Sequence, residues 1–236
     1  MGDSREAGEC PEVVWSGDEL DWVKPRGARE YLRGVGYRYL RGYPFDDGYE
    51  RLLREYRPSR RYKLALILPC SYGKPYSQSY IHYLIRSRIA GYIKKGVVHE
   101  VIVTNAGVVP RELDEHWPYT AYDWNPGHET QAIRECYRRV LAERLRGYME
   151  KYSSYYERWA AYLRWDSDSW KAVVDASRSL GIEIVNLAPR SVPWGEVEEA
   201  GLGLGYDSDP DIILVTRTGL GALASGLEEL LGAPHS

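Results

Sequence analysis

The sequence predicts an α/β protein, a three-layer sandwich with a mostly parallel central sheet and helices on both faces. Two short runs rich in apolar and β-branched residues, Lys63–Leu68 and Val97–Thr104, are typical of strands buried on both faces. Between them, residues 77–93 carry apolar side chains at helical spacing. These three segments therefore predict a right-handed, parallel strand–helix–strand unit. Two later runs, Gly181–Leu187 and Asp211–Thr216, predict further buried strands.

Three other segments predict helices. Asp46 or Asp47 is expected to cap a helix that ends before Pro58, and residues 219–231 are expected to form a closing helix. Residues 130–163 form a long helical stretch with room for one break. An apolar and aromatic stripe follows its helical spacing, and packing in a core or a subunit contact is favoured over stacking on nucleobases. The stripe consists of Leu141, Leu145, Tyr148, Tyr152, Tyr155, Trp159 and Tyr162.

The pattern divides the chain into two parts. Residues 1–61 are expected to be an N-terminal helical segment packed on the core, and residues 62–236 to be the α/β core domain. Within the first part, residues 16–19 (SGDE) resemble a capping box that opens a short helix. Residues 27–41 stay ambiguous, because two glycines interrupt an otherwise helical pattern. No function is evident in this N-terminal part.

The composition places few constraints on binding partners. The net charge of −3 and the pI of about 6.0 give no overall basic surface of the kind that nucleic-acid-binding proteins carry. Arginines cluster at residues 57–61 and 134–146, but solvated helix faces explain these clusters better than a binding surface does. The chain has three Asn and two Gln, and such scarce amides fit a thermophilic source.

The three cysteines, Cys10, Cys70 and Cys136, are odd in number and far apart. They match neither a CxxC metal pair nor the framework of a secreted disulfide protein, so a reducing compartment is expected. The acidic N-terminus lacks the apolar core of a signal peptide, and no apolar stretch approaches the roughly 20 residues that span a bilayer. These features predict a cytoplasmic protein without a membrane partner.

Two loops carry most of the unusual residues. PCSYGKPYSQ follows the first predicted strand, and the long segment from Asn105 to His128 follows the second. Open α/β sheets bind ligands at the carboxyl ends of their strands. We therefore expect the two loops to form two walls of one site.

The first loop offers three candidates for chemistry. Cys70 is a potential thiolate nucleophile if Lys74, His82 or a helix N-terminus lowers its pKa, although a buried, inert cysteine is equally expected. Lys74 can bind an anion or activate a neighbour, or it can be an ordinary surface lysine. His82 shares a helix face with Ser79 and is the best candidate for a general acid or base, although most isolated histidines are structural.

The second loop offers binding groups. Arg111 presents a fork suited to phosphate or carboxylate, unless it forms an internal pair with Glu112. Asp123 can orient an amine or close an Asx turn. His116 and His128 lack a ligand pattern with Cys or carboxylates, so no metal site is expected.

Seven residues of the first loop and its helix match the pattern Pro-Cys-x3-Lys-Pro-Tyr-x2-Ser-x2-His. They are Pro69, Cys70, Lys74, Pro75, Tyr76, Ser79 and His82. A second segment, Gly-Val-Val-Pro-Arg-Glu-Leu followed by Pro and Tyr-Asp, is present at Gly107–Leu113, Pro118, Tyr122 and Asp123. Over about residues 62–128 the chain therefore resembles the core domain of the archaeosine synthase family, which is related to archaeal tRNA-guanine transglycosylases.

The resemblance implies a tRNA-modifying enzyme without a cofactor. It would add an amine, lysine in this family, to the nitrile of 7-cyano-7-deazaguanine in tRNA, as a stand-alone or split core subunit. Cys70 would form a thioimidate, His82 or Lys74 would donate a proton, and Asp123 or Glu112 would hold the amine. The catalytic residues expected are Cys70, Lys74, Ser79, His82 and Asp123. The substrate-binding residues expected are Pro69, Ser71, Pro75, Tyr76, Asn105, Gly107, Arg111, Glu112 and Tyr122.

The resemblance also has consequences for partners. Members of the family carry a transglycosylase-like part and a C-terminal PUA domain, so tRNA and a partner chain with such parts are expected, and a homo-oligomer is a further option. After Asp123 the sequence WNPGHET differs from the Thr-Gly-x-Trp turn of the family. Two alternatives stay open: a non-catalytic nucleobase- or RNA-binding module that recruits an enzyme, and a glycosylase-like hydrolase acting on a nucleobase.

Overall fold

A computed structural model describes residues 10–14, 32–119, 122–204 and 209–232. Its main sheet has five strands in the order β5-β4-β3-β7-β8. Three of the pairings are parallel, and β5 runs antiparallel to β4. The α/β class is confirmed, and the sheet is mixed because the edge strand β5 returns as a hairpin. The strands are β3 (Tyr62–Leu68), β4 (Val98–Thr104), β5 (Gly107–Pro110), β7 (Tyr156–Ala161) and β8 (Ile184–Asn186).

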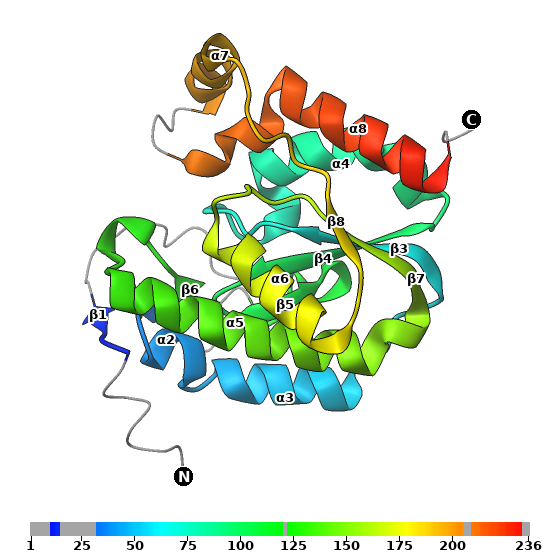
Figure 1. Ribbon diagram of the computed structural model, residues 1–236. Coiled ribbons are helices and arrows are strands. Elements are labelled where there is room, and N and C mark those ends of the chain that lie inside the picture. Colours follow the sequence, from blue (N-terminus) through cyan, green and yellow to red (C-terminus); the bar gives the residue numbers. More distant parts are fainter. Residues whose placement is uncertain (1–9, 15–31, 120–121, 205–208, 233–236) are drawn as a thin grey trace.

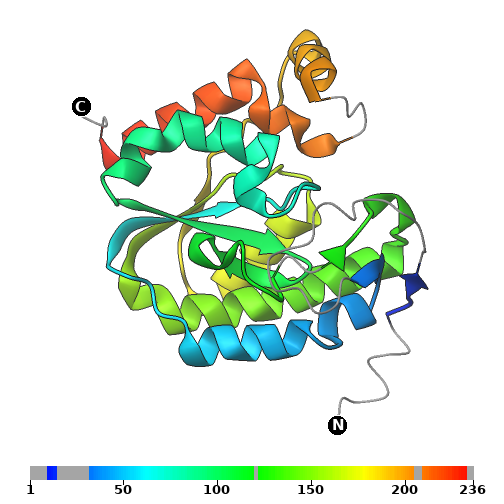
Figure 2. The same ribbon diagram turned by 180° about the vertical axis from the view of Figure 1, so that it is seen from behind.

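Helices cover both faces of this sheet, so the three layers are confirmed (Figure 1; Figure 2). One face carries α4 and α8, which contact each other. The other carries α5 and α6, with α3 alongside α5 (Figure 1). These helices are α3 (Phe45–Glu55), α4 (Tyr80–Lys94), α5 (Gln131–Tyr152), α6 (Asp168–Leu180) and α8 (Arg217–Leu231). The central strand explains the arrangement: every residue from Leu64 to Leu68 is fully buried, as the apolar run predicted.

The remaining elements are short or lie at the periphery. The α-helices among them are α2 (Arg38–Arg41) and α7 (Trp194–Leu204). The 3₁₀ helices are η2 (Tyr76–Gln78), η3 (Arg111–Leu113), η4 (Pro126–His128), η5 (Ser153–Tyr155) and η6 (Pro210–Val215). No helix in the described part of the chain is long and apolar enough to cross a membrane.

A second, three-stranded sheet lies beside the first and consists of β1 (Val13–Val14), β2 (Leu32–Val35) and β6 (Tyr122–Asp123). The central strand β2 runs antiparallel to β1 and parallel to β6. Of the ambiguous residues 27–41, those from 32 onward are described, and they form the strand β2 and the short helix α2. The N-terminal part consequently supplies the strand that pairs with Tyr122 and Asp123 of the second family-like segment.

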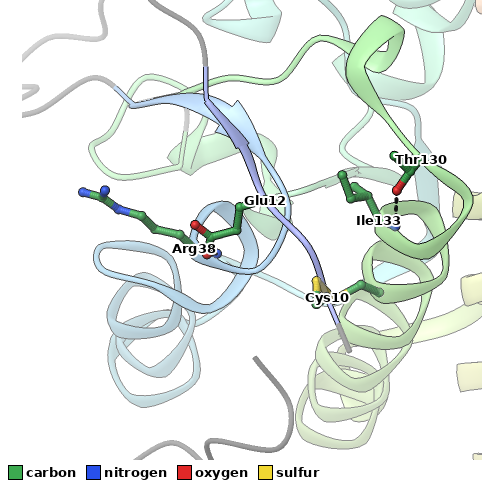
Figure 3. Close-up of a disulfide and its surroundings, with 6 residues drawn as sticks. Cys10, Glu12, Arg38, Thr130 and Ile133 are labelled. Atoms are coloured by element: carbon green, nitrogen blue, oxygen red, sulfur yellow. Dashed lines mark hydrogen bonds between the residues drawn. A yellow bond between two sulfur atoms is a disulfide. The ribbon is translucent and has the colours of Figure 1, made fainter. Parts of the chain in front are cut away.

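A disulfide joins Cys10, just before β1, to Cys136 on α5 (Figure 3). The expectation of a chain without disulfides is therefore wrong, because a sequence separation of 126 residues hid the pair. Both cysteines are buried in the second hydrophobic cluster, which packs the small sheet against α5. Figure 3 also shows Thr130 capping α5, with its hydroxyl oxygen accepting a hydrogen bond from the backbone N–H of Ile133 at 3.3 Å.

The long helix expected over residues 130–163 ends early. It stops at Tyr152, and residues 156–161 form the strand β7, which pairs with the central strand β3. The helical spacing of the aromatic residues continues across this boundary by coincidence, while Tyr and Trp are also good strand formers. The prediction of a single helical stripe is therefore wrong beyond Tyr152. The prediction that these side chains pack in a core is confirmed, because Tyr148, Tyr152 and Trp159 all belong to the main hydrophobic cluster.

Two smaller expectations also fail. Residues 211–216 do not form a strand, because Asp209 caps a 3₁₀ helix there by accepting a hydrogen bond from the backbone N–H of Asp211. The N-cap of α3 is Pro44 rather than Asp46 or Asp47. The expected capping box at residues 16–19 lies outside the described residues. The closing helix and the strands β3, β4 and β8 are confirmed, within a few residues at their ends.

We expect Cys136→Ser to lower the free energy of unfolding by about 2–5 kcal/mol in non-reducing buffer, because the disulfide restricts the unfolded chain. Denaturant titration with and without dithiothreitol measures this. Cys70→Ser is the matched control, since Cys70 is a free cysteine and its replacement should show no dependence on the reductant. A destabilisation by Cys136→Ser that is equally large in reductant would contradict the disulfide.

Candidate functional site

The main sheet has a topological switch point at its central strand. From β3 the chain leaves toward α4 on one face, and from the neighbouring β7 it leaves toward α6 on the opposite face. In open α/β sheets such a point opens a crevice at the carboxyl ends of the strands. The register pairs Ile67 with Ala161 at the ends of β3 and β7, and Cys70 follows β3 at this edge of the sheet. The switch point therefore places Cys70 at the edge where open α/β sheets commonly bind ligands.

Cys70 and Lys74 are both held toward their neutral forms. Burial raises the pKa of the Cys70 thiol from 9.0 to about 12, and the charge of Lys74 opposes this rise. Burial also lowers the pKa of Lys74, while Cys70 and Asp123 act in the opposite direction. Lys74 is only 6% exposed. Each residue exerts the largest electrostatic influence on the other's pKa, which makes them an interacting pair.

The two loops predicted to be walls of one site do meet. The hydroxyl groups of Tyr76 and Tyr122 lie 2.5 Å apart and share a hydrogen bond. The ammonium nitrogen of Lys74 lies 4.4 Å from the centre of the Tyr122 ring, within the range of a cation–π contact. Next to Tyr122, the buried Asp123 has a carboxylate oxygen 4.0 Å from Nε of Arg33 on β2. The structure thus brings together Cys70 and Lys74 with the two tyrosines and Asp123.

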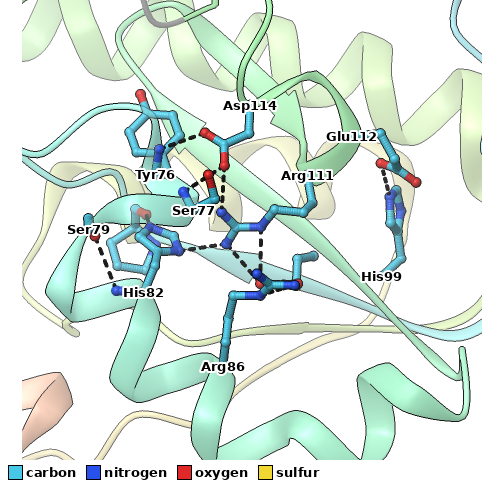
Figure 4. A network of polar contacts seen from close by, with 11 residues as sticks. Tyr76, Ser77, Ser79, His82, Arg86, His99, Arg111, Glu112 and Asp114 are labelled. Carbon is cyan, nitrogen blue, oxygen red and sulfur yellow. Dashed lines mark hydrogen bonds and ion pairs between the residues drawn. The ribbon is translucent and has the colours of Figure 1, made fainter. Parts of the chain in front are cut away.

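Arg111 lies at the centre of a buried polar network (Figure 4). Its Nε and Nη2 donate to a carboxylate oxygen of Glu100 at 3.2 and 2.8 Å, and its Nη1 donates to Asp114 at 3.1 Å. Asp114 in turn accepts hydrogen bonds from the backbone N–H groups of Tyr76 and Ser77 at 2.6 and 2.7 Å. The expected internal pair of Arg111 exists, but with Glu100 and Asp114 rather than Glu112. Its fork is occupied by protein groups, which argues against the expected role in binding a substrate.

His82 is fully buried in the same network. Arg111 Nη2 lies 2.7 Å from His82 Nδ1, and His82 Nε2 lies 3.0 Å from the carbonyl oxygen of Pro69. A guanidinium only donates, so Nδ1 accepts and Nε2 carries the proton that it donates to Pro69. Burial, and next the charge of Arg111, hold the pKa of His82 well below its usual value. This arrangement leaves no ring nitrogen for a substrate and argues against the acid–base role suggested by the sequence.

Ser79 has a structural task in α4. It is the N-cap residue, and its hydroxyl oxygen accepts a hydrogen bond from the backbone N–H of His82 at 3.2 Å, as the spacing predicted. Ser71 likewise bonds within its own loop, donating its hydroxyl to the carbonyl oxygen of Gly73 at 2.9 Å. Both serines thus shape the backbone between Cys70 and His82.

Glu112 belongs to a different cluster. One of its oxygens lies 2.9 Å from Nε2 of His99, and Tyr56 donates its hydroxyl to the same oxygen at 3.2 Å. Figure 4 shows this pair apart from the Arg111–His82 contact. The reason is strand alternation, because His99 and Glu100 point to opposite faces of β4. Glu112 therefore does not join Cys70 and Lys74, contrary to the expectation that it holds the amine there.

Asn105 and Gly107 follow β4 and pack on Arg144, which is fully buried on α5. Arg144 Nη1 donates to the carbonyl oxygen of Asn105 at 3.2 Å, and Nη2 donates to Asp46 at 2.8 Å. Gly107 has φ +108, and a Cβ there would lie 2.7 Å from Cδ of Arg144. The Nδ2 amide of Asn105 is buried and has no hydrogen-bond partner among the described residues. Gly107 is thus needed for packing, whereas the Nδ2 donor of Asn105 stays unused among the described residues.

Several residues of the site were not anticipated from the sequence. Arg33 lies in the N-terminal part, which gave no functional signal. Asp114 follows Arg111 by three residues, a spacing that could have suggested the ion pair. Arg164 and Asp211 form an ion pair at 2.8 Å, and the charge of Asp211 acts on the pKa of Cys70. Asp211 lies in the segment 211–216, which was wrongly predicted to be a strand.

Comparison with known families matches residues 48–189 to the family described as Domain of unknown function (DUF5591). This match covers more than half of the 236 residues and includes Cys70, Lys74 and Asp123. The chain belongs to this family.

Three curated relatives carry the name archaeosine synthase subunit alpha. The protein of Thermoplasma acidophilum is 40% identical over 93 residues, which are 36% of this chain and 18% of that protein. That of Thermococcus kodakarensis is 37% identical over 107 residues, 43% of this chain and 18% of the relative. That of Methanosarcina acetivorans is 46% identical over 59 residues, which are 25% of this chain and 9% of that protein. Each alignment thus spans less than a fifth of the relative.

Among solved structures, the crystal structure of AF0587, a protein of unknown function, is similar with a TM-score of 0.47 and 23% identity. The similarity covers 76% of this chain and 49% of that one.

We expect Gly107→Ala to destabilise the protein by about 1–3 kcal/mol, since alanine is strained at positive φ and its Cβ collides with Arg144. Gly221→Ala on α8 is the control, because nothing lies within 4 Å of the added methyl group and helix propensity should make it neutral or stabilising. Thermal unfolding of both variants measures the difference. Equal stability of the two variants would contradict a packing role for Gly107.

We expect His82 to remain neutral, with its proton on Nε2, at pH values where an unfolded histidine is already protonated. An unfolded histidine takes up a proton near pH 6.5, so His82 should make folding less favourable as the pH falls below that value. Long-range ¹H–¹⁵N NMR spectra of the imidazole distinguish the tautomers and the imidazolium. An imidazolium pattern for His82 at pH 6 would contradict the assigned hydrogen bonds.

Proposed function

We propose that this protein takes part in tRNA modification of the archaeosine-synthase type, adding an amine to the nitrile of 7-cyano-7-deazaguanine in tRNA. The observation that carries the proposal is the interacting pair of Cys70 and Lys74, both shifted toward neutrality at the carboxyl end of the central strand. The three partial relatives named archaeosine synthase subunit alpha support the same reaction class.

A thiol and an amine that are both shifted toward their neutral forms suit addition to a nitrile. In the proposed first step, Lys74 takes the proton of the Cys70 thiol, and the sulfur forms a bond to the nitrile carbon while one π bond opens. The proton on Lys74 then moves to the nitrile nitrogen, which gives a neutral thioimidate. In the second step the donor amine forms a C–N bond, the C–S bond breaks, and the thiolate takes back a proton. The product is an amidine, and no oxidant or reductant is needed.

Lys74 is the proposed proton carrier because its burial lowers its pKa and raises the fraction of free amine. His82 instead positions the backbone before Cys70 through Pro69. Asn105 is proposed to donate its buried Nδ2 to the substrate, where charge develops on the nitrile nitrogen or on the base. Asp123 is proposed to keep Lys74 oriented, since its charge acts on the pKa of Lys74.

The proposed partners are tRNA and a second chain that helps to hold it. The alignments leave more than four-fifths of each relative unmatched, and the net charge of −3 gives this chain no overall attraction for RNA. A transglycosylase-like or PUA-containing chain would supply the basic surface.

One observation favours a second candidate. A thiol with a pKa of about 12 is scarcely ionised at neutral pH, which fits a non-catalytic module that binds the modified nucleobase and recruits an enzyme. The two candidates differ in a measurable way, because only the first requires proton transfer between Cys70 and Lys74.

The test uses tRNA bearing 7-cyano-7-deazaguanine, lysine and the protein, with and without a transglycosylase-like partner, followed by nucleoside mass spectrometry. We expect a lysine-sized mass increase, a fall of about 100-fold or more in rate for Lys74→Met, and loss of a protein–tRNA adduct in Cys70→Ser. The rate should increase with pH, because the free amine of Lys74 is the active form. Lys95→Met, at the exposed end of α4, is the control and should keep the wild-type rate.

Three other outcomes would contradict the proposed reaction. Full activity of both Lys74→Met and Cys70→Ser would remove these residues from the mechanism. Tight binding of the modified tRNA without any product would favour the binding module, and release of the free base would favour a hydrolase.

A further inference from the structure

Arg33 reaches the candidate site from a part of the chain that lies outside the family match, which begins at residue 48. It lies on β2, which pairs in parallel with β6, and the register of this pair places Arg33 opposite Asp123. Nε of Arg33 is 4.0 Å from a carboxylate oxygen of Asp123, and the two side chains are 17% and 1% exposed. Register and distance thus both make Arg33 a direct neighbour of Asp123.

The strand that carries Arg33 is also fixed on its other edge. There β1 pairs with β2 in antiparallel fashion, and the disulfide of Cys10 ties the start of β1 to α5 (Figure 3). Leu32 and Val35 on β2, together with Tyr122 on β6, are buried in the second hydrophobic cluster. A side chain on β2 therefore has a defined position, which a positioning role requires.

Asp123 interacts electrostatically with two basic side chains. Burial lowers the pKa of Lys74, and the charges of Cys70 and Asp123 act in the opposite direction. Arg33 is the second basic group. The titratable and charged groups around Lys74 are the thiol of Cys70 after β3, Tyr122 and Asp123 on β6 and, through Asp123, Arg33 on β2. A buried carboxylate is costly without a cation, and Arg33 supplies one that keeps its charge at any ordinary pH.

We propose that Arg33 is a positioning residue that compensates the charge of Asp123, so that Asp123 orients Lys74 without holding it as an ammonium ion. Without Arg33, Lys74 would take a larger share in compensating the buried carboxylate, and an opposite charge favours the charged form of its neighbour. Less free amine would then remain at neutral pH. The effect on Lys74 needs no substrate, whereas its consequence for the reaction rests on the proposed function.

The first experiment follows the titration of Lys74 by NMR in protein labelled with ¹³C and ¹⁵N in lysine, with the Lys74 signal identified by its loss in Lys74→Met. In Arg33→Met the midpoint of this titration should move to higher pH, because Asp123 then favours the ammonium form. Arg33→Lys keeps the charge and should restore most of the wild-type behaviour. Arg41→Met is the matched control, because Arg41 is also 17% exposed and pairs with a carboxylate, that of Glu143 on α5.

The second experiment measures the rate of the tRNA reaction against pH. At pH 7 the rate of Arg33→Met should be about tenfold lower or less than that of the wild type, and it should recover as the pH is raised and the free amine returns. A purely structural defect would instead lower the rate by the same factor at every pH.

A double variant tests whether Arg33 acts through Asp123. Arg33→Met/Asp123→Asn should show the Lys74 midpoint of Asp123→Asn alone, because the carboxylate that transmits the effect is missing from both proteins. The double variant contains no uncompensated buried carboxylate at this position. It therefore permits the measurement even if Arg33→Met does not fold.

The outcomes separate this inference from the proposed function. A Lys74 midpoint in Arg33→Met equal to that in Arg41→Met overturns the inference, whether or not the wild type forms product. A difference between the double variant and Asp123→Asn also overturns it, because Arg33 would then act on Lys74 by another route. A midpoint at higher pH in Arg33→Met supports the effect on Lys74. If the wild type then forms no product with any donor, the proposed function alone fails.

Discussion

The guanidinium group of Arg111 organises the candidate site. Through four hydrogen bonds it neutralises two buried carboxylates, on β4 and just after η3, and fixes the tautomer of His82. His82 then holds the carbonyl group next to Cys70, and Asp114 holds the amides after Lys74. Two buried carboxylates would be costly without a cation. Both ends of the Cys70–Lys74 loop therefore depend on one charge.

This frame holds a cysteine and a lysine together at one end of the central strand. Burial shifts the pKa of the thiol upward and that of the amine downward, and the cation–π contact with Tyr122 helps to keep the lysine in place.

Local sequence was sufficient to predict the strands and the helix that carry the candidate site. The buried strands β3 and β4 followed from continuous apolar runs, and α4 with its Ser79 cap followed from spacing and capping chemistry. The two motif segments correctly indicated that Lys74, Tyr76, Tyr122 and the thiol of Cys70 would gather. Residues 156–161 were misassigned because aromatic spacing alone does not separate a helix from a strand, and only pairing with β3 decided it.

The sequence by itself determined the α/β rhythm, the location of the site at strand ends and the residue types available there. Tertiary structure alone decided how those residues are paired and buried. Arg111 and His82 form hydrogen bonds with each other and with their buried neighbours, and Glu112 pairs with His99. The charge of Asp211 acts on Cys70, which lies 141 positions earlier in the chain. Hydrogen-bond partners and burial depend on distances between remote segments, and no local pattern encodes those distances.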